Sequence, residues 1–381
     1  MKVPFARPFF SMEDEDEIQS GIRNVLRSGW LTSGKNVELL EKEFAQLVGT
    51  RFAVAVNSCT AALHSVLISL NLKAGDEVLV PSNTFVATAN SALYTGAKPV
   101  FVDSDVETFN ISPTDCEEKI TPRTRAIIVV HLAGNPCDMK RFSEMAEDHR
   151  IDLIEDCAHA HGSKFQGTNC GSFGIAGAFS FYATKVVTAC EGGVVTTDDS
   201  KLAERVKRIR NQGRGGYGPQ EIIELGHNYR MSDVHAVIGL SQLRHLSGFV
   251  HERQEIAERY EKLLSDTKWV TPQKINPGDT CAYYAYIVRL AKAAPLQRDE
   301  VVKKLDEQGI ETSVLYHPAH NQPLYRTILP ANHSCPTAVE LGRSTLALPM
   351  FNGMGSNEFD YFEEKWRGTV EPYVEQYAGT N

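Results

Sequence analysis

From about residue 50 onward, short runs of apolar and β-branched residues alternate with segments whose apolar residues recur at helical spacing. Residues 52–56 and 126–130 are apolar throughout, and residues 60–70 have the periodicity of a helix. A strand that is apolar on both sides is buried on both faces, as in a parallel sheet covered by helices. The pattern therefore predicts an α/β fold, a three-layer sandwich with a mostly parallel central sheet.

The chain shows further elements of both kinds before residue 211. We expect strands at residues 77–80, 100–102, 151–154, 178–181 and 193–196, and helices at residues 84–94, 139–149 and 199–210. Ligands of open α/β sheets bind beyond the carboxyl ends of the strands. Residues 57–60, Glu155 with Asp156, and Lys185 follow such ends, so we expect them to meet in one site.

The pattern changes after Asn211, where a glycine-rich loop spans residues 213–218. Prolines and glycines near residues 270–280 mark a linker. In this part we expect helices at residues 232–249, 251–265 and 299–308, the last stopped by Gly309, and strands at residues 283–290 and 312–315. We therefore predict a large domain of residues 1–250 and a smaller C-terminal α+β domain of residues 251–381.

Charge and composition narrow the range of partners. The formal net charge of −9 argues against binding to nucleic acids or membrane surfaces, which requires a basic face. We find no signal peptide and no apolar run of membrane-spanning length, and the eight cysteines form no C-x-x-C pair or zinc spacing. We therefore expect a cytoplasmic protein with reduced thiols and no metal site.

Lys185 is the first candidate for chemistry. It follows the apolar and aromatic run 177–182 and precedes residues 191–193, whose glycines let the backbone turn back tightly. A single lysine is more commonly a solvated surface residue. A lysine in apolar surroundings, however, loses its charge readily and becomes a nucleophile toward an aldehyde. Pyridoxal 5′-phosphate (PLP) requires such a lysine, and we predict Lys185 as the catalytic residue.

Asp156 and His159, which follow the strand at residues 151–154, suit the same cofactor. Asp156 would pair with the protonated ring nitrogen of PLP, and the alternative is a helix N-cap. His159 would contact the ring or its phenolic oxygen, and a histidine packed in a turn is equally well supported.

Small and hydroxyl residues at positions 57–60 join a strand to a helix. Amides at the start of that helix could hold a phosphate, with the hydroxyls of Thr60 and Ser180 as added donors, although a plain N-cap has the same pattern. Phe85 would stack on the pyridine ring, whereas periodicity alone favours a core aromatic on a helix.

Two later segments carry aromatic and polar residues. Residues 226–233 are typical of a loop that ends in a helix N-cap. Residues 316–320 contain Tyr316, His317 and His320, and they form either a surface turn or a wall of the substrate site.

Taken in order, these segments resemble the DegT/StrS family of PLP-dependent nucleotide-sugar aminotransferases, which have fold type I. The resemblance extends over nearly the whole chain. It rests on residues 28–34, 44–45, 75–78, 81–88, 155–160, the Lys185 segment, 226–231 and 317–320. Each motif alone is weak, but so many in the same order argue against chance.

The resemblance implies a role for each cofactor residue. Lys185 would form the covalent link to PLP, Asp156 would bind the ring nitrogen, and His159 would lie near the phenolic oxygen. Phe85 would stack on the ring.

The resemblance also implies how the phosphate is held. The backbone of Cys59 and Thr60 would bind it together with Ser180, and Asn228 would reach in from a second subunit. The active site would then be shared within an obligate homodimer.

A reaction follows from the same resemblance. L-Glutamate would donate the amino group to a nucleotide-linked keto sugar, for an amino sugar of a surface polysaccharide or a glycosylated metabolite. Thr32, Tyr316, His317 and His320 would line the sugar site. The pattern at residues 30–32 is similar to enzymes that act on 4-keto rather than 3-keto sugars, which favours a 4-keto-6-deoxy sugar.

Two positions depart from the family. It usually has glycine at the position of Cys59 and glycine or alanine near Cys190, and cysteine would be strained at Cys59 if that position needs a positive φ. Sugar dehydratases of the family carry histidine in place of the lysine, so Lys185 favours transamination. A PLP-dependent dehydratase or lyase and a non-catalytic PLP-binding regulator are the alternatives.

Overall fold

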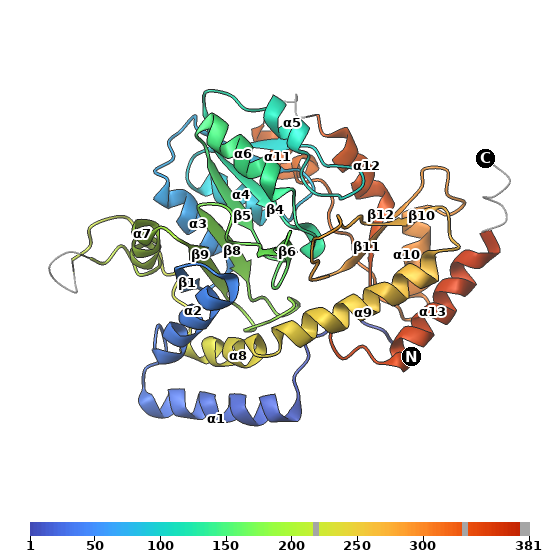
Figure 1. Cartoon of the computed structure of the whole chain (residues 1–381), viewed down its shortest axis with the longest axis horizontal. Coiled ribbons are helices and arrows are strands. Elements are labelled where there is room, and N and C mark those ends of the chain that lie inside the picture. Colours follow the sequence, from blue (N-terminus) through green and yellow to red (C-terminus); the bar gives the residue numbers. More distant parts are fainter. Residues whose placement is uncertain (216–220, 330–333, 374–381) are drawn as a thin grey trace.

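The computed structural model describes residues 1–215, 221–329 and 334–373, and its centre is a seven-stranded sheet (Figure 1). The strands are β1 (Phe52–Val56), β2 (Glu77–Pro81), β3 (Lys98–Val102), β4 (Thr124–Val130), β5 (Asp152–Asp156), β8 (Ala176–Ser180) and β9 (Gly193–Thr197). They lie in the order β1-β9-β8-β5-β4-β2-β3. Neighbours from β8 to β3 are parallel, whereas β9 is antiparallel to both β1 and β8. The prediction of a mostly parallel sheet is confirmed.

Helices cover both faces of this sheet, because its strands direct apolar side chains alternately to the two faces. On one face lie α3 (Cys59–Ser69), α4 (Ala87–Tyr94) and α7 (Ser200–Arg210). On the other face α2 (Lys35–Val48) and α8 (Asp233–Leu243) cover the β1 side, and α5 (Pro113–Glu118) and α6 (Met139–His149) cover the β3 side. The predicted three-layer α/β sandwich is confirmed.

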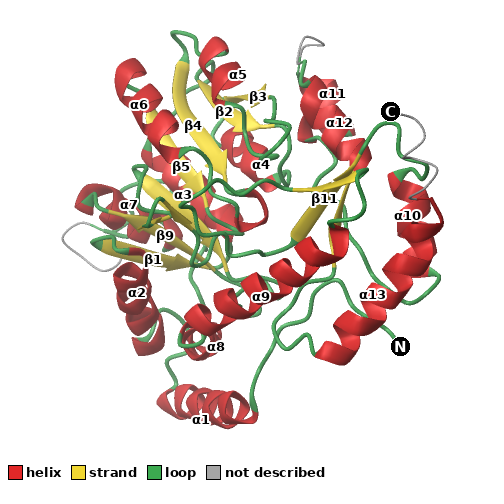
Figure 2. Ribbon diagram, turned by 45° about the vertical axis from the view of Figure 1, so that its right-hand side comes forward, coloured by secondary structure: helices red, strands yellow, loops and turns green. Residues whose placement is uncertain are grey.

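A second, antiparallel sheet lies in the C-terminal part of the chain (Figure 2). It consists of β10 (Val270–Pro272), β11 (Tyr286–Leu290) and β12 (Thr345–Leu348), and it shares a core with α9 (Leu246–Leu264), α10 (Arg298–Asp306) and α13 (Ser356–Val370). The start of α9 packs in the core of the large sheet and its end in the core of the small one. The predicted domain boundary at residue 250 falls within this helix and stays a prediction.

The remaining elements flank or connect these layers. They are α1 (Met12–Ser28), α11 (Pro323–Ile328), α12 (Pro336–Ser344), β6 (Lys164–Phe165), β7 (Thr168–Asn169), and the 3₁₀ turns η1 (Leu132–Gly134), η2 (Ala319–Asn321) and η3 (Glu371–Tyr373). Within the described ranges, every helix is too short or too polar to cross a membrane.

Two predictions about the later part of the chain need correction, and a third lies partly outside the described residues. The helix predicted at residues 232–249 is interrupted between α8 and α9. The strand predicted at residues 312–315 is an isolated bridge between Ser313 and Ala347, because the chain then turns toward the large sheet and the Tyr316 amide donates to Asn83 Oδ1 (3.0 Å). Of the glycine-rich loop, residues 216–218 lie outside the described residues.

Candidate active site

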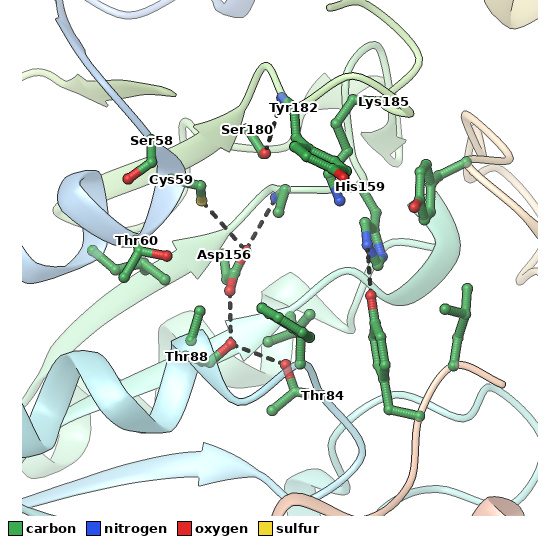
Figure 3. A pocket seen from close by; sticks show the side chains of 18 of the residues that line it. Ser58, Cys59, Thr60, Thr84, Thr88, Asp156, His159, Ser180, Tyr182 and Lys185 are labelled. Carbon is green, nitrogen blue, oxygen red and sulfur yellow. Dashed lines mark hydrogen bonds between the residues drawn. The ribbon is translucent and has the colours of Figure 1, made fainter. Parts of the chain in front are cut away.

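A pocket of about 430 Å³ lies at the carboxyl ends of the parallel strands (Figure 3). Strand β5 ends at Asp156, β8 ends at Ser180, and α3 begins at Cys59 shortly after β1. Lys185, in the loop after β8, lines the same pocket. Side chains that are far apart in the sequence therefore meet where parallel strands end, as expected for a sheet of this kind.

Asp156 is the buried carboxylate of this pocket, with 5% of its surface exposed. Its Oδ2 accepts a hydrogen bond from Thr88 Oγ1 (2.8 Å), and its Oδ1 accepts one from the Ala158 amide (3.1 Å). Burial raises the pKa of the carboxyl, and these two donors and the charge of Lys185 oppose the rise. Because turns and the strand β6, and not a helix, follow Asp156, the N-cap alternative is wrong. Since Asp156 forms no ion pair within the described chain, it can accept a cationic ligand group.

The amino end of α3 faces the pocket. Ser58 is the N-cap of this helix, and its Oγ accepts a hydrogen bond from the Ala61 amide (3.1 Å). The first amides of a helix have no acceptor within it, so those of Cys59 and Thr60 are available to an anion. Cys59 does not adopt a positive φ, so the strain considered for this departure from the family does not arise; the positive φ, of 66°, belongs to Cys190.

Gly193, the first residue of β9, allows β9 to approach this helix end closely. A Cβ at this position would overlap the Ser58 carbonyl and lie 2.7 Å from the Cys59 nitrogen. We expect Gly193→Ala to displace the start of α3, which weakens PLP binding by roughly tenfold and lowers the free energy of unfolding by about 1–3 kcal/mol. Titration with PLP and unfolding in urea measure the two effects. Gly248→Ala is the control, since a Cβ there meets no atom within 4 Å, and equal behaviour of the two variants contradicts the expectation.

Lys185 is partly buried, unlike the solvated surface lysine of the alternative interpretation. Its Nζ lies 4.4 Å from the centroid of the Tyr284 ring, a distance at which the ring face attracts an ammonium group. Ser180 lies close by, and its Oγ accepts a hydrogen bond from the Tyr182 amide (3.4 Å). The Ser180 hydroxyl therefore keeps its own proton to donate to a ligand.

His159 is buried in the pocket and stacks on Tyr284, with ring centroids 4.1 Å apart and planes inclined by 16°. Its Nδ1 accepts a hydrogen bond from the Ala133 amide (3.2 Å), which places the ring proton on Nε2. Nε2 then donates to the Tyr316 hydroxyl oxygen (3.2 Å). Burial, together with the charge of Lys185, holds the pKa of His159 well below its ordinary value, so the ring is neutral.

Phe85 lines the pocket with 59% of its surface exposed. It precedes α4, which begins at Ala87 rather than at residue 84 as predicted. Its ring centroid is 5.9 Å from that of Tyr316. The alternative of a core aromatic on a helix is therefore wrong, and the ring face is accessible to a ligand.

Four predicted site residues do not line this pocket: Thr32, Asn228, His317 and His320. Thr32 lies in a separate hollow with Trp30 and Arg230. Asn228 and His317 are exposed, and His320 Nδ1 shares a hydrogen bond with Ser82 Oγ (2.5 Å). Their proposed roles, like those of the residues inside the pocket, stay predictions.

Thr88 and Tyr284 line the pocket although they were not predicted from the sequence. Thr88 follows Thr84 at the spacing that brings two hydroxyls to one side of a helical turn, a signal that could have found it. Tyr284 lies between Tyr283 and Tyr286 at the start of β11, and no local pattern shows which of the three rings lines the pocket.

His131, Glu155 and Cys157 form a buried group whose ligand-type atoms lie within 4.8 Å of one another. Hydrogen bonds already satisfy the histidine and the glutamate: His131 Nδ1 accepts from the Cys137 amide (3.0 Å), and its Nε2 donates to Glu155 Oε2 (3.1 Å). Glu155 also accepts from the amides of residues 171, 173 and 174. This set ties β4 and β5 to the loop before β8, which accounts for the group without a metal.

The chemistry of the pocket suits PLP in each part of the cofactor. Helix amides and a serine hydroxyl suit the phosphate, and a buried carboxylate suits the protonated ring nitrogen. A partly buried primary amine suits the aldehyde, and an exposed aromatic face suits the ring. The residues present therefore fit this group.

Comparisons with known proteins agree with this geometry. The family model of the DegT/DnrJ/EryC1/StrS aminotransferases matches residues 12–366. The chain is 36% identical to the spore coat polysaccharide biosynthesis protein SpsC of Bacillus subtilis over 97% of each protein. It is 35% identical to GDP-perosamine synthase of Escherichia coli O157:H7 over 95% of this chain and 97% of that protein. Spr1654 of Streptococcus pneumoniae, solved in a PLP form, superposes with a TM-score of 0.91 at 28% identity over 98% of this chain and 100% of that one.

These matches cover almost the entire chain, at identities above 30% for both relatives. The predictions of the family resemblance, of fold type I and of a PLP-dependent transaminase are confirmed. The chain belongs to the DegT/DnrJ/EryC1/StrS aminotransferase family.

Proposed function

We propose that this chain binds PLP and transfers an amino group from L-glutamate to a nucleotide-linked keto sugar, in the biosynthesis of an amino sugar. The observation that carries this proposal is the convergence of Lys185, Asp156 and the amino end of α3 in one pocket. The PLP and PMP forms of Spr1654 support the cofactor. The names of GDP-perosamine synthase and SpsC support a nucleotide sugar as acceptor and a polysaccharide as destination.

We place the phosphate of PLP at the amides of Cys59 and Thr60 and at the Ser180 hydroxyl, where the α3 dipole favours negative charge. Asp156 then faces the ring nitrogen, and the exposed ring of Phe85 covers the pyridine face. When bound, the cofactor supplies an electron sink for the carbon that exchanges its proton.

Lys185 has two tasks in this proposal. Its Nζ would hold the cofactor covalently between turnovers, and as a free amine it would take up and return the proton of the carbon at which the amino group is exchanged. The Tyr284 ring, 4.4 Å away, gives the displaced amine a place to rest inside the pocket.

We propose that the Tyr316 hydroxyl donates a hydrogen bond to the sugar or to the phenolic oxygen of the cofactor. Its oxygen already accepts a hydrogen bond from His159 Nε2, so its own proton is available to donate. Burial raises the pKa of the Tyr316 hydroxyl, and the group therefore keeps this proton at neutral pH. Thr32, His317 and His320 remain candidates for the sugar, which we propose to be a 4-keto-6-deoxy sugar.

We further propose a homodimer in which Asn228 of the partner subunit completes the phosphate site. Asn228 is exposed in the protomer, and the exposed apolar side chains of Ile222, Ile223 and Leu225 precede it. A partner subunit would cover these side chains. We expect the enzyme to work in the cytoplasm, in keeping with its eight free cysteines.

The test is a pair of half-reactions. Purified protein loaded with PLP is mixed with L-glutamate, and we expect the visible absorption band to bleach while one 2-oxoglutarate forms per active site. Addition of a nucleotide-linked 4-keto-6-deoxy sugar should restore the band and yield a product with an amino group in place of the carbonyl oxygen, detected by mass spectrometry.

The same assay separates the alternatives. A dehydratase or lyase would convert the sugar without leaving an amino group on it, and a regulator would bind PLP without reacting with any amino donor. Either outcome overturns the proposed function.

A further inference from the structure

Two threonine hydroxyls lie in series with Asp156 in the pocket (Figure 3). Thr84 Oγ1 is 2.9 Å from Thr88 Oγ1, which is 2.8 Å from Asp156 Oδ2. Both threonines are buried, as is the carboxylate. Three polar side chains therefore form a continuous hydrogen-bonded row away from solvent.

The direction of these hydrogen bonds follows from the chemistry of the groups. An ionised carboxylate accepts hydrogen bonds but cannot donate them, so the single hydroxyl proton of Thr88 points at Asp156 Oδ2. Thr84 must then donate to the Thr88 oxygen. Each hydrogen bond polarises the next, and the hydrogen-bonded chain ends at the ionised carboxylate of Asp156.

The Thr88 hydroxyl does not form the hydrogen bond that is usual for threonine in a helix. Helical threonines commonly return their hydroxyl proton to the carbonyl of the preceding turn. Thr88 is the second residue of α4, and its hydroxyl is hydrogen-bonded to side-chain oxygens on both sides. Its proton is thus directed at the pocket carboxylate rather than at its own helix.

Asp156 needs such donors because it is buried. None of the charged or titratable groups around it forms an ion pair with it within the described chain; these are Lys185 in the loop after β8, His131 after β4, Cys59 in α3, Cys157 next to it and Tyr316. Burial raises the pKa of the carboxyl, and the Ala158 amide and the Thr88 hydroxyl are the leading contributions that oppose this rise.

We propose that Thr84 and Thr88 are positioning residues that keep Asp156 ionised and oriented toward the ring nitrogen of PLP, a role that rests on the proposed function. Asp156 and the ring nitrogen compete for one proton. Each hydrogen bond donated to the carboxylate stabilises its charged form, so the proton stays on the ring nitrogen. Without Thr88 the shared proton moves toward Asp156, and the bound cofactor becomes a weaker electron sink.

The test compares Thr88→Val, which keeps the shape and removes the hydroxyl, with Thr88→Ser, which restores it. We expect Thr88→Val to bind PLP roughly 10- to 100-fold more weakly than the wild type, the range for loss of a hydrogen bond to a charged group. NMR of the isotopically labelled ring nitrogen of bound PLP should show a shift toward the unprotonated form. Thr88→Ser should return both measurements to near the wild-type values.

Two further variants complete the design. Thr84→Val should have an effect in the same direction but less than tenfold in affinity, since it acts one bond further away. It also provides the test if Thr88→Val does not fold. Thr95→Val, which removes a hydroxyl just after the carboxyl end of α4, should leave the labelled nitrogen signal unchanged.

The outcomes separate this proposal from the proposed function. If Thr88→Val binds PLP with wild-type affinity and shows an unchanged nitrogen signal, the positioning role of the two threonines is wrong, but the proposed function is unaffected. Equal losses of PLP affinity in Thr88→Val and Thr88→Ser would mean that packing, and not the hydroxyl, causes the effect. This result would also contradict the positioning role. A wild-type protein that neither binds PLP nor reacts with glutamate overturns the proposed function itself.

Discussion

Lys185→Ala is expected to lower the turnover of amino transfer by roughly 10⁴-fold or more, because it removes both the covalent attachment of PLP and the group that moves the proton. Lys185→Arg should lose as much, since a guanidinium keeps its charge and cannot take up the proton. Steady-state rates and the visible spectrum measure the effect. The band of the attached cofactor should be absent from both variants, while PLP still binds through its phosphate.

The control for this result is Lys201→Ala, which removes an exposed lysine at the start of α7. Its turnover should equal that of the wild type. A Lys185 variant that turns over at the wild-type rate, or that keeps the visible band, would show that another amine holds the cofactor.

Asp156→Asn should have the second largest effect, a loss of transition-state stabilisation of about 3–5 kcal/mol, which is the cost of leaving a buried charge without its partner. Turnover should fall by roughly 10²- to 5 × 10³-fold. Asparagine has nearly the shape of aspartate, but its single side-chain oxygen can accept only one of the two hydrogen bonds that Thr88 and the Ala158 amide donate, so the change removes the charge and one acceptor. The amino-transfer rate and the affinity for PLP measure the loss.

Asp152→Asn is the matched control, because it removes a carboxylate from the opposite end of the same strand. Its activity should stay within about twofold of the wild type, because this half-buried carboxylate is remote from the site. Similar losses in the two variants would mean that a change in the net charge of the enzyme, and not the partner of the ring nitrogen, determines the rate.

Much of the large sheet could be predicted from the sequence, because its buried strands are apolar runs with clear limits. Strand β1 has the predicted bounds, and β5 and β8 differ from the predicted strands by one residue at one end and two at the other. The error at residues 312–315 has a physical cause. A strand needs a neighbour along its length, and only Ser313 finds one before the chain turns toward Asn83.

The site was harder to predict than the sheet. Lys185, Asp156 and the Cys59–Thr60 segment follow strand ends, and topology brings such positions together. Phe85 could not be separated from a core aromatic, because exposure depends on what packs around a ring and not on its spacing. Thr88 and Tyr284 became site residues only through contacts with distant parts of the chain.

The sequence by itself determined the order of helices and strands and the kind of chemistry, because hydrophobic periodicity is local and a lysine, a carboxylate and a helix start keep their properties wherever they lie. Only the tertiary structure decided which groups meet. The order of the strands brings Asp156 beside the start of α4, where the hydroxyls of Thr84 and Thr88 lie, and the segment before β11 brings the Tyr284 ring to Lys185. Contacts of this kind join residues far apart in the chain, and their geometry is set by packing of the whole fold.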